Sequence, residues 1–196
     1  MKKYLSLITV GLVLTSATSA RASFHLFDIR EAYSNGDGSV QFIELFTTSN
    51  FQNQLSGHSL SYIVGSTTTN TLNFTTNLGS PTTANMSVLI GTANLTALYG
   101  VTPDYVIPAN FFAAGATSTL DFGSGTDVIN LTNLPTNGVM SLDGLVANNG
   151  TTASDTALNA QGTPTNFAGQ TATIPEPSVV TLAILGLIAA ARRKRS

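Results

Sequence analysis

The amino-acid sequence predicts an all-β protein, an antiparallel β-sandwich, from three observations. Seven short apolar runs recur between residues 24 and 131, and several alternate apolar and polar side chains, as half-buried strands do. Segments rich in glycine, asparagine and serine separate these runs and are typical of turns. Threonine and aromatic side chains, which fit a pleated surface, are frequent within the runs. This pattern favours a two-sheet sandwich over residues 23–147.

The strands are predicted from the apolar runs in chain order: residues 24–32, 40–46, 60–64, 71–75, 86–90, 118–122 and 127–131. The sequence Asn-Gly-Asp-Gly at residues 35–38 predicts a hairpin between the first two strands. One short helix is expected over residues 93–99, ended by Gly100. Residues 148–173 have few long apolar side chains, so we expect a closing segment followed by a linker.

The charge is divided unevenly between the ends and the middle of the chain. Between residues 23 and 173 one basic residue, Arg30, stands against nine acidic residues, a net charge of −8, whereas the whole chain has −2. Such an acidic middle excludes nucleic acid as a partner, because binding to phosphates needs Lys and Arg. The chain has no cysteine, which excludes disulfides, thiol catalysis and thiolate metal sites.

Residues 1–22 have the three parts of a secretory signal peptide in order. Lys2 and Lys3 supply the positive start, residues 5–14 are apolar, and small residues follow. Ala20 and Ala22 form an A-x-A site for signal peptidase, so we expect cleavage after Ala22, with cleavage after Ala20 as the alternative. The N-terminal segment is therefore expected to be a signal helix that directs export.

The C-terminal segment, residues 174–196, carries a second pattern. Pro175, Glu176 and Pro177 precede an uncharged stretch over residues 178–191, and the chain then ends in a basic cluster of Arg192, Arg193, Lys194 and Arg195. Fourteen helical residues span about 21 Å, less than the roughly 30 Å of a bilayer core. We therefore expect a short transmembrane helix that makes a temporary membrane stop, with the basic cluster on the cytoplasmic side.

The three parts of residues 174–196 resemble the PEP-CTERM sorting signal of Gram-negative bacteria. The resemblance implies that an exosortase in the inner membrane recognises Pro175, Glu176 and Pro177 and cuts near them. Signal peptidase is the processing enzyme expected for the N-terminal segment. The resemblance also implies delivery to the cell surface or to the extracellular polysaccharide matrix. A plain single-span anchor is the alternative interpretation of the same residues.

The middle of the chain carries a further resemblance. Residues 27–31, 41–45 and 55–60 are similar to the opening of a lamin-tail-like domain, which implies an immunoglobulin-like sandwich. A group of bacterial PEP-CTERM proteins without assigned chemistry shares the patterns at residues 101–105, 134–138 and 164–169. Neither resemblance implies a cofactor or a catalytic residue.

Few residues of the middle are candidates for chemistry. His25 and His58 lack the paired spacing of metal ligands, so structural roles are favoured and no metal is expected. Glu31 and Glu44 lie on neighbouring predicted strands, and two carboxylates placed in this way could act as a general acid and a general base. The favoured interpretation is that they accept hydrogen bonds from the backbone or pair with Arg30. Residues 35–39 lack the glutamate that a calcium loop needs at its end, so a turn is expected.

These observations favour an exported, non-enzymatic surface or matrix protein without a cofactor. The alternative is a module that binds glycan or ice, which an exposed row of aromatic side chains would support; the candidates are Tyr62, Phe74, Tyr99 and Tyr105. A matrix hydrolase that uses Glu31 and Glu44 is a third hypothesis.

Overall fold

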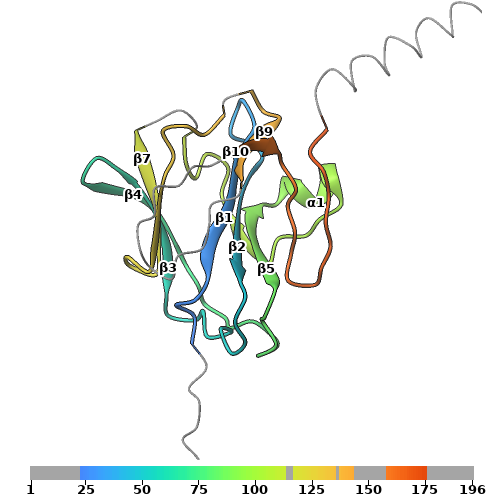
Figure 1. Ribbon diagram of the computed structural model, residues 1–196. Helices are drawn as coiled ribbons and strands as arrows, with labels where there is room; N and C mark the ends of the chain where they lie inside the picture. The colour runs from blue at the N-terminus through green and yellow to red at the C-terminus, as the bar shows by residue number, and fades with distance from the viewer. Residues whose placement is uncertain (1–22, 114–116, 136, 144–157, 176–196) are drawn as a thin grey trace, which may run out of the picture.

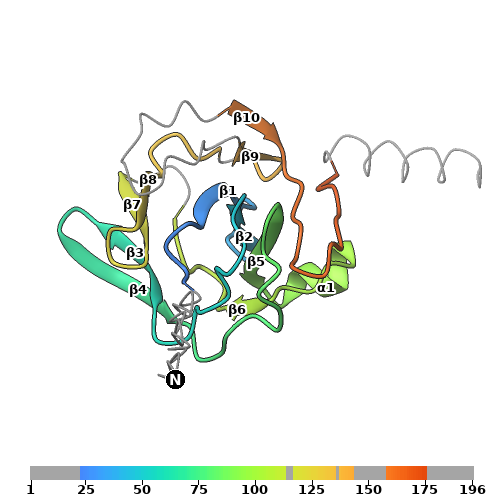
Figure 2. The same ribbon diagram turned by 60° about the horizontal axis from the view of Figure 1, so that its bottom comes forward.

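Two β-sheets form the protein in the computed structural model, which describes residues 23–113, 117–135, 137–143 and 158–175. The strand order of the larger sheet is β10-β9-β1-β2-β5-β6, and that of the smaller is β4-β3-β7-β8 (Figures 1 and 2). The strands of the larger sheet are β1 (Asp28–Ser34), β2 (Gln41–Thr47), β5 (Met86–Thr92), β6 (Tyr105–Ile107), β9 (Met140–Asp143) and β10 (Leu158–Gln161). Those of the smaller sheet are β3 (Ser59–Val64), β4 (Thr67–Asn73), β7 (Ser118–Phe122) and β8 (Asp127–Asn130).

The main core lies between the two sheets, because alternate side chains of both sheets point toward each other. Its larger members are fully or almost fully buried: Phe27, Ile29, Ile43, Leu45, Val88 and Ile90 from one side, and Leu60, Tyr62, Leu120, Phe122 and Ile129 from the other. The predicted two-sheet β fold is therefore confirmed.

A second apolar cluster covers the outer face of the larger sheet. Its buried members are Tyr33, Val40, Phe42, Leu89, Leu95, Val101 and Ile174. The short helix α1 (Asn94–Tyr99) and the C-terminal residues 162–174 lie over this face, beside β5 (Figures 1 and 2). The central strands β1, β2 and β5 are therefore buried on both faces, which explains their nearly continuous burial patterns.

A β-bulge in β1 decides which side chains reach the outer face. Ile29 pairs with Leu45, but the next pair along the ladder is Glu31 with Glu44, so Arg30 is the extra residue. Because side chains alternate with a period of two, this insertion moves Glu31 to the face opposite that of Ile29. Glu31 and Glu44 consequently lie next to each other on the outer face.

The predicted elements agree with the structure along most of the chain. Each of the seven predicted strands overlaps an observed strand, and residues 35–38 form the β1–β2 turn. The predicted helix is α1, and Gly100 ends it with a left-handed φ of 76°. Three strands, β6, β9 and β10, were not predicted. The sheets are antiparallel except for one pair, because β6 lies parallel to β5.

The domain extends beyond residue 147, the boundary drawn from the sequence. Strand β10 pairs with β9, and Ile174 is 1 % exposed in the outer cluster. The described part of residues 148–173 therefore contacts the larger sheet through β10 and through the residues that lead to Ile174. Composition suggested a linker because this segment has few long apolar side chains, yet its packing depends on polar contacts.

Several expectations fall on residues that the structure does not describe. These are the signal peptide with Ala20 and Ala22, the end of the sorting motif at Glu176 and Pro177, the apolar stretch over residues 178–191, and the basic cluster Arg192, Arg193, Lys194 and Arg195. Within the described residues, no helix has the length and hydropathy to cross a membrane.

Candidate functional site

Residues 162–174, called the C-terminal clasp from here on, form the most elaborate polar site of the described residues. The clasp is a hairpin: Thr165 and Thr171 form a β-bridge, and the Ala172 N–H donates to the Pro164 carbonyl at 3.2 Å. It follows β10 directly and folds back across the outer face of the larger sheet (Figure 2). The end of the clasp adjoins Pro175, the first residue of the predicted sorting motif.

Glu31 fixes the first half of the clasp to β1. Its Oε1 accepts a hydrogen bond from the Thr163 backbone N–H at 3.0 Å, and its Oε2 accepts one from the Thr163 hydroxyl at 3.3 Å. The Ser141 side chain on β9 also hydrogen-bonds to Glu31. An ionised carboxylate can accept hydrogen bonds at both oxygens. Glu31 therefore supplies an acceptor for a backbone N–H of the clasp that does not bond to a neighbouring strand.

Glu44 makes the equivalent attachment from β2. Its Oε2 accepts from the Thr165 backbone N–H at 2.8 Å, and its Oε1 accepts from the Ser87 hydroxyl at 2.7 Å. The two glutamates thus take alternate N–H groups of the clasp, at Thr163 and Thr165. This is the spacing at which an extended chain presents N–H groups toward one side.

The tip of the clasp docks on the loop before β6. The Asn166 side-chain Nδ2 donates to the Thr102 carbonyl at 2.9 Å, and the Phe167 N–H donates to Asp104 Oδ2 at 2.8 Å. The same Asp104 oxygen accepts from the Leu89 N–H on β5 at 2.8 Å. Two of the sequence patterns noted above, at residues 101–105 and 164–169, are therefore one contact in the fold.

Ile174 closes the clasp and ends the packed part of the domain. Its N–H donates to the Gly162 carbonyl at 2.8 Å, and its carbonyl accepts from Gln161 Nε2 at 2.7 Å. A Cβ at Gly162 would lie 2.9 Å from Ile174 Cγ1, so only glycine lets this side chain sit so close. Pro175 follows and is exposed. The predicted motif thus begins one residue after a fully packed position.

Burial changes the electrostatics of the two anchoring glutamates, each of which is 2 % exposed. Burial raises the pKa of Glu31 to about 7, against the lowering effect of its hydrogen bonds, and the negative charges of Glu44 and Asp143 raise it further. Burial also raises the pKa of Glu44, with hydrogen bonds and the charge of Arg30 acting in the opposite direction.

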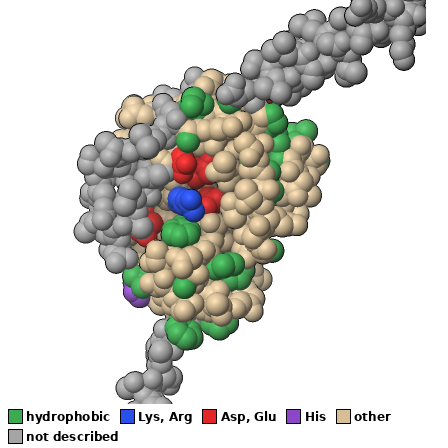
Figure 3. Space-filling model, turned by 45° about the vertical axis from the view of Figure 1, so that its right-hand side comes forward, with side chains coloured by type: hydrophobic (Ala, Val, Ile, Leu, Met, Phe, Trp, Pro, Cys, Tyr) green, Lys and Arg blue, Asp and Glu red, His purple; other side chains and the backbone are tan. Residues whose placement is uncertain are grey.

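Arg30 is the only basic residue of the described chain, and the β1 bulge presents it beside these carboxylates. Its Nη1 lies 3.6 Å from Glu44 Oε1, its guanidinium lies 4.9 Å from the centroid of the Phe46 ring, and its side chain is 48 % exposed. Figure 3 shows the basic patch between acidic ones on a face that is otherwise mostly uncharged. The pairing with Arg30 and the backbone hydrogen bonds are the roles favoured for Glu44 from the sequence.

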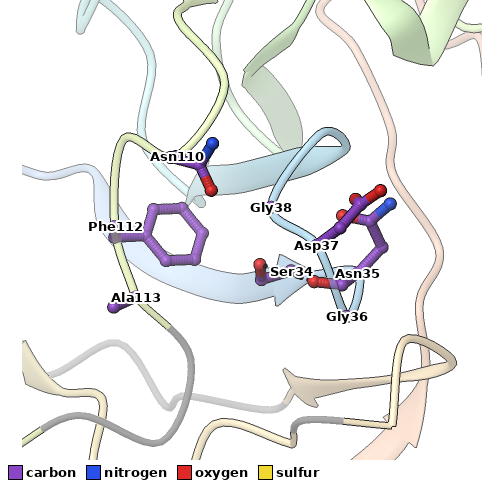
Figure 4. Close-up of a pocket in the computed structure, with 8 residues that line it drawn as sticks. All are labelled: Ser34, Asn35, Gly36, Asp37, Gly38, Asn110, Phe112 and Ala113. Atoms are coloured by element: carbon purple, nitrogen blue, oxygen red, sulfur yellow. Dashed lines mark hydrogen bonds between the residues drawn. The ribbon is translucent and has the colours of Figure 1, made fainter.

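A shallow pocket of about 260 Å³ lies between the β1–β2 turn and the loop after β6 (Figure 4). It is lined by Ser34, Asn35, Gly36, Asp37, Gly38, Asn110, Phe112 and Ala113. The polar groups of the turn are used within it: Asp37 Oδ1 accepts from the Ser39 N–H at 2.9 Å, and Asn35 Oδ1 accepts from the Val40 N–H at 3.0 Å. These contacts are those of a turn, as expected from the sequence.

The two histidines have structural partners. The ring of His58 stacks on Phe24 with centroids 3.3 Å apart, and His25 Nδ1 hydrogen-bonds with the Ser23 hydroxyl. Among the described residues, no group of three His, Asp or Glu side chains is arranged to hold a metal ion. Neither histidine lies at the clasp.

The four aromatic side chains proposed as a ligand-binding row do not form one. Tyr62 and Phe74 are buried, with 4 % and 2 % exposed. Tyr105 packs edge-on against Phe74 in the main core, whereas Tyr99 packs against the cluster on the other side of the larger sheet. This arrangement removes the feature that would have supported a glycan- or ice-binding face.

The sequence placed Glu31 and Glu44 together but did not reveal what they bind. Thr163, Thr165, Asn166 and Asp104 were missed as members of one site, because their contacts cross more than fifty residues of chain. The sequence offered one indication of this contact: the patterns at residues 101–105 and 164–169 both belong to the resemblance to bacterial PEP-CTERM proteins. No protein-family model, curated protein or solved structure matches this chain.

Proposed function

We propose that this chain is an exported, non-enzymatic protein of the cell surface or extracellular matrix, sorted through a C-terminal signal of the PEP-CTERM kind. The order of parts in the sequence supports this: a signal peptide over residues 1–22, then the domain, then Pro175, Glu176 and Pro177, an apolar stretch and a basic end. The partners under this proposal are signal peptidase, an exosortase and the inner membrane during processing. The mature protein is then located in, or in contact with, extracellular polysaccharide.

The observation that carries the proposal is where the packed domain ends. The clasp packs on the outer face up to Ile174, which is buried there, and Pro175 is exposed. A sorting motif has to be available to its enzyme while the domain stays folded. Ile174, the last buried residue of the described chain, directly precedes the predicted motif.

The surroundings of Glu31 and Glu44 favour a non-enzymatic role for the domain. Both are almost fully buried, and the carboxylate oxygens of both accept hydrogen bonds from the clasp or from Ser87. A general acid or base needs hydrogen-bond reach to a substrate. These carboxylates instead hold part of the protein's own backbone.

We further propose that the sandwich is immunoglobulin-like and related to lamin-tail domains. The apolar positions of the resemblance support this, because Leu45, Leu55 and Leu60 are all fully buried in the main core. Ile29 pairs with Leu45 across the first two strands. Packing of these three leucines between two sheets is what a sandwich of this kind requires.

The test is mass spectrometry of the mature termini in cells with and without the exosortase. We expect surface protein that begins after Ala22, or after Ala20, and that lacks the basic cluster Arg192–Arg195 only when the exosortase is present. Glu176→Ala is expected to leave the tail uncut, and Asp37→Ala, in the exposed β1–β2 turn, is the matched control. An intact tail on wild-type surface protein would contradict sorting and leave a simple anchor.

A further inference from the structure

We propose that the last strand of the clasp, residues 171–174, has to leave the domain before the sorting protease can take the motif, so that the clasp controls processing. This inference rests on the proposed function. It names residues 171–174 as the part of the substrate that the enzyme contacts on the amino side of the motif. The fold holds those residues in a form that no protease cleft can accept.

The residue next to the motif is the most constrained of the segment. Ile174 is 1 % exposed, and both its N–H and its carbonyl are hydrogen-bonded, to Gly162 and Gln161. Two residues upstream, the Ala172 N–H is bonded to Pro164. A protease that cuts beside Pro175 has to contact Ile174, and in the closed clasp neither its side chain nor its backbone is available.

Reach gives a second, independent argument. Residues 175–177 span at most about 10 Å when extended. With the clasp closed, the end of the motif can therefore lie no more than about 10 Å from Ile174, which keeps the enzyme close to the surface of the domain. Release of residues 171–174 adds about 13 Å of extended chain, which allows the motif to enter a cleft at the membrane surface while the domain remains outside.

Release of the strand leaves most of the fold in place. The anchoring glutamates hold Thr163 and Thr165, in the first half of the clasp, and not residues 171–174. Local opening of a terminal segment is the kind of motion that a native protein makes without global unfolding. In the cut itself one peptide C–N bond breaks, the acceptor's nucleophilic atom joins the carbonyl carbon, and the proton of the acceptor, water or an amine, passes to the departing amine.

The structure offers a direct way to lock the clasp. A Cβ built at Gly162 lies 3.5 Å from the Cβ of Ile174, within the range found in disulfides. The chain contains no cysteine that could compete. The double variant Gly162→Cys with Ile174→Cys is therefore expected to form a disulfide after export into an oxidising compartment and to keep the last strand in place.

The experiment compares processing of the full-length chain in exosortase-containing cells, read by mass spectrometry of the C-terminus with alkylation to report the disulfide. We expect the wild type and both single-cysteine variants to be cut, and the oxidised double variant to remain uncut until a reductant is added. Asn166→Ala, which frees the clasp tip from Thr102 without touching the motif, is expected to be cut faster than the wild type.

The outcomes separate the two proposals. Cutting of the double variant with its disulfide intact would overturn the inference and leave the sorting function standing. A reduced double variant that stays uncut would show that the block does not come from the closed clasp, and would also overturn the inference. A wild-type chain whose tail is never removed contradicts the sorting function itself.

Discussion

The carboxyl group of Glu31 lies beneath the clasp, and its raised pKa links the stability of the domain to pH. An unfolded chain has a glutamate pKa near 4.5, and burial raises that of Glu31 to about 7. The folded state therefore binds the proton more tightly than the unfolded state. The resulting stabilisation is fully present below about pH 4.5 and is lost as the pH rises through about 7.

We expect the free energy of unfolding to fall between pH 5 and pH 8, by about 3 kcal/mol at most from Glu31 alone, since one pKa unit corresponds to about 1.4 kcal/mol. Denaturant titrations at a series of pH values measure this. Glu31→Gln, which keeps the shape and removes the titration, should flatten the profile and be more stable than the wild type at pH 8. An unchanged slope in that variant would contradict the assignment.

Arg30 owes its importance to its position rather than to its charge. Its ion pair is half-exposed and its contact with Phe46 lies at the surface, and such interactions contribute about 1 kcal/mol or less. As the extra residue of the bulge, however, it sets the phase of β1 on either side. The bulge therefore lets β1 contain one residue more than the matching part of β2 while Ile29 and Glu31 pair with adjacent residues of β2.

At the scale of elements, the β1 bulge is what sends apolar side chains inward on both sides of Arg30. Deletion of Arg30 leaves a plain ladder in which Ile29 still faces the main core and Glu31 still faces outward, so the side chains of β1 keep their faces. We expect this variant to fold, with a cooperative thermal transition by circular dichroism. Arg30→Ala keeps the bulge and is the control, with a loss of about 1 kcal/mol or less. Loss of the cooperative transition in the deletion variant would contradict the assignment of Arg30 as the extra residue.

The elements that the sequence predicted share one property, a local pattern. Strands β2, β3 and β5 are apolar runs between turns, and α1 ends at a glycine. The strands that were missed are short: β6 has three residues, and β9 and β10 have four each. Their pairing comes from neighbours elsewhere in the chain, which a local pattern does not contain.

In the candidate site, too, the residues with a local pattern were predicted and those held by distant contacts were not. Glu31 and Glu44 were identified as a pair because they lie on adjacent strands of a predicted hairpin. Most of the clasp falls within residues 148–173, for which the scarcity of long apolar side chains predicts a closing segment and a linker. Its order comes from acceptors that are distant in sequence, and a polar segment held in this way has the composition of a loop.

At the scale of the whole molecule, the clasp completes the cover of a sheet that has a core on each side. Without residues 162–174, the outer face would expose Tyr33, Phe42 and Leu89 from the three central strands. The clasp is thus part of the domain and not an appendage of the tail.

A chain of residues 23–161 is therefore expected to bind a hydrophobic dye and to associate in solution, whereas a chain of residues 23–175 should remain monomeric with a sharp thermal transition. Dye fluorescence and size-exclusion chromatography distinguish the two chains. Equal behaviour of both would show that α1 and the sheet edge suffice to cover the outer face.

The attachment of the clasp also sets the order of events when the protein is made. Thr163 binds Glu31 across 132 residues, and Thr165 binds Glu44 across 121 residues. Strands β1 and β2 are synthesised early, yet their outer face stays open until almost the last residue of the domain has emerged. Contacts that join such distant parts of a chain form slowly. Completion of the fold is thus a late event, timed by the arrival of the same residues that lead into the predicted sorting motif.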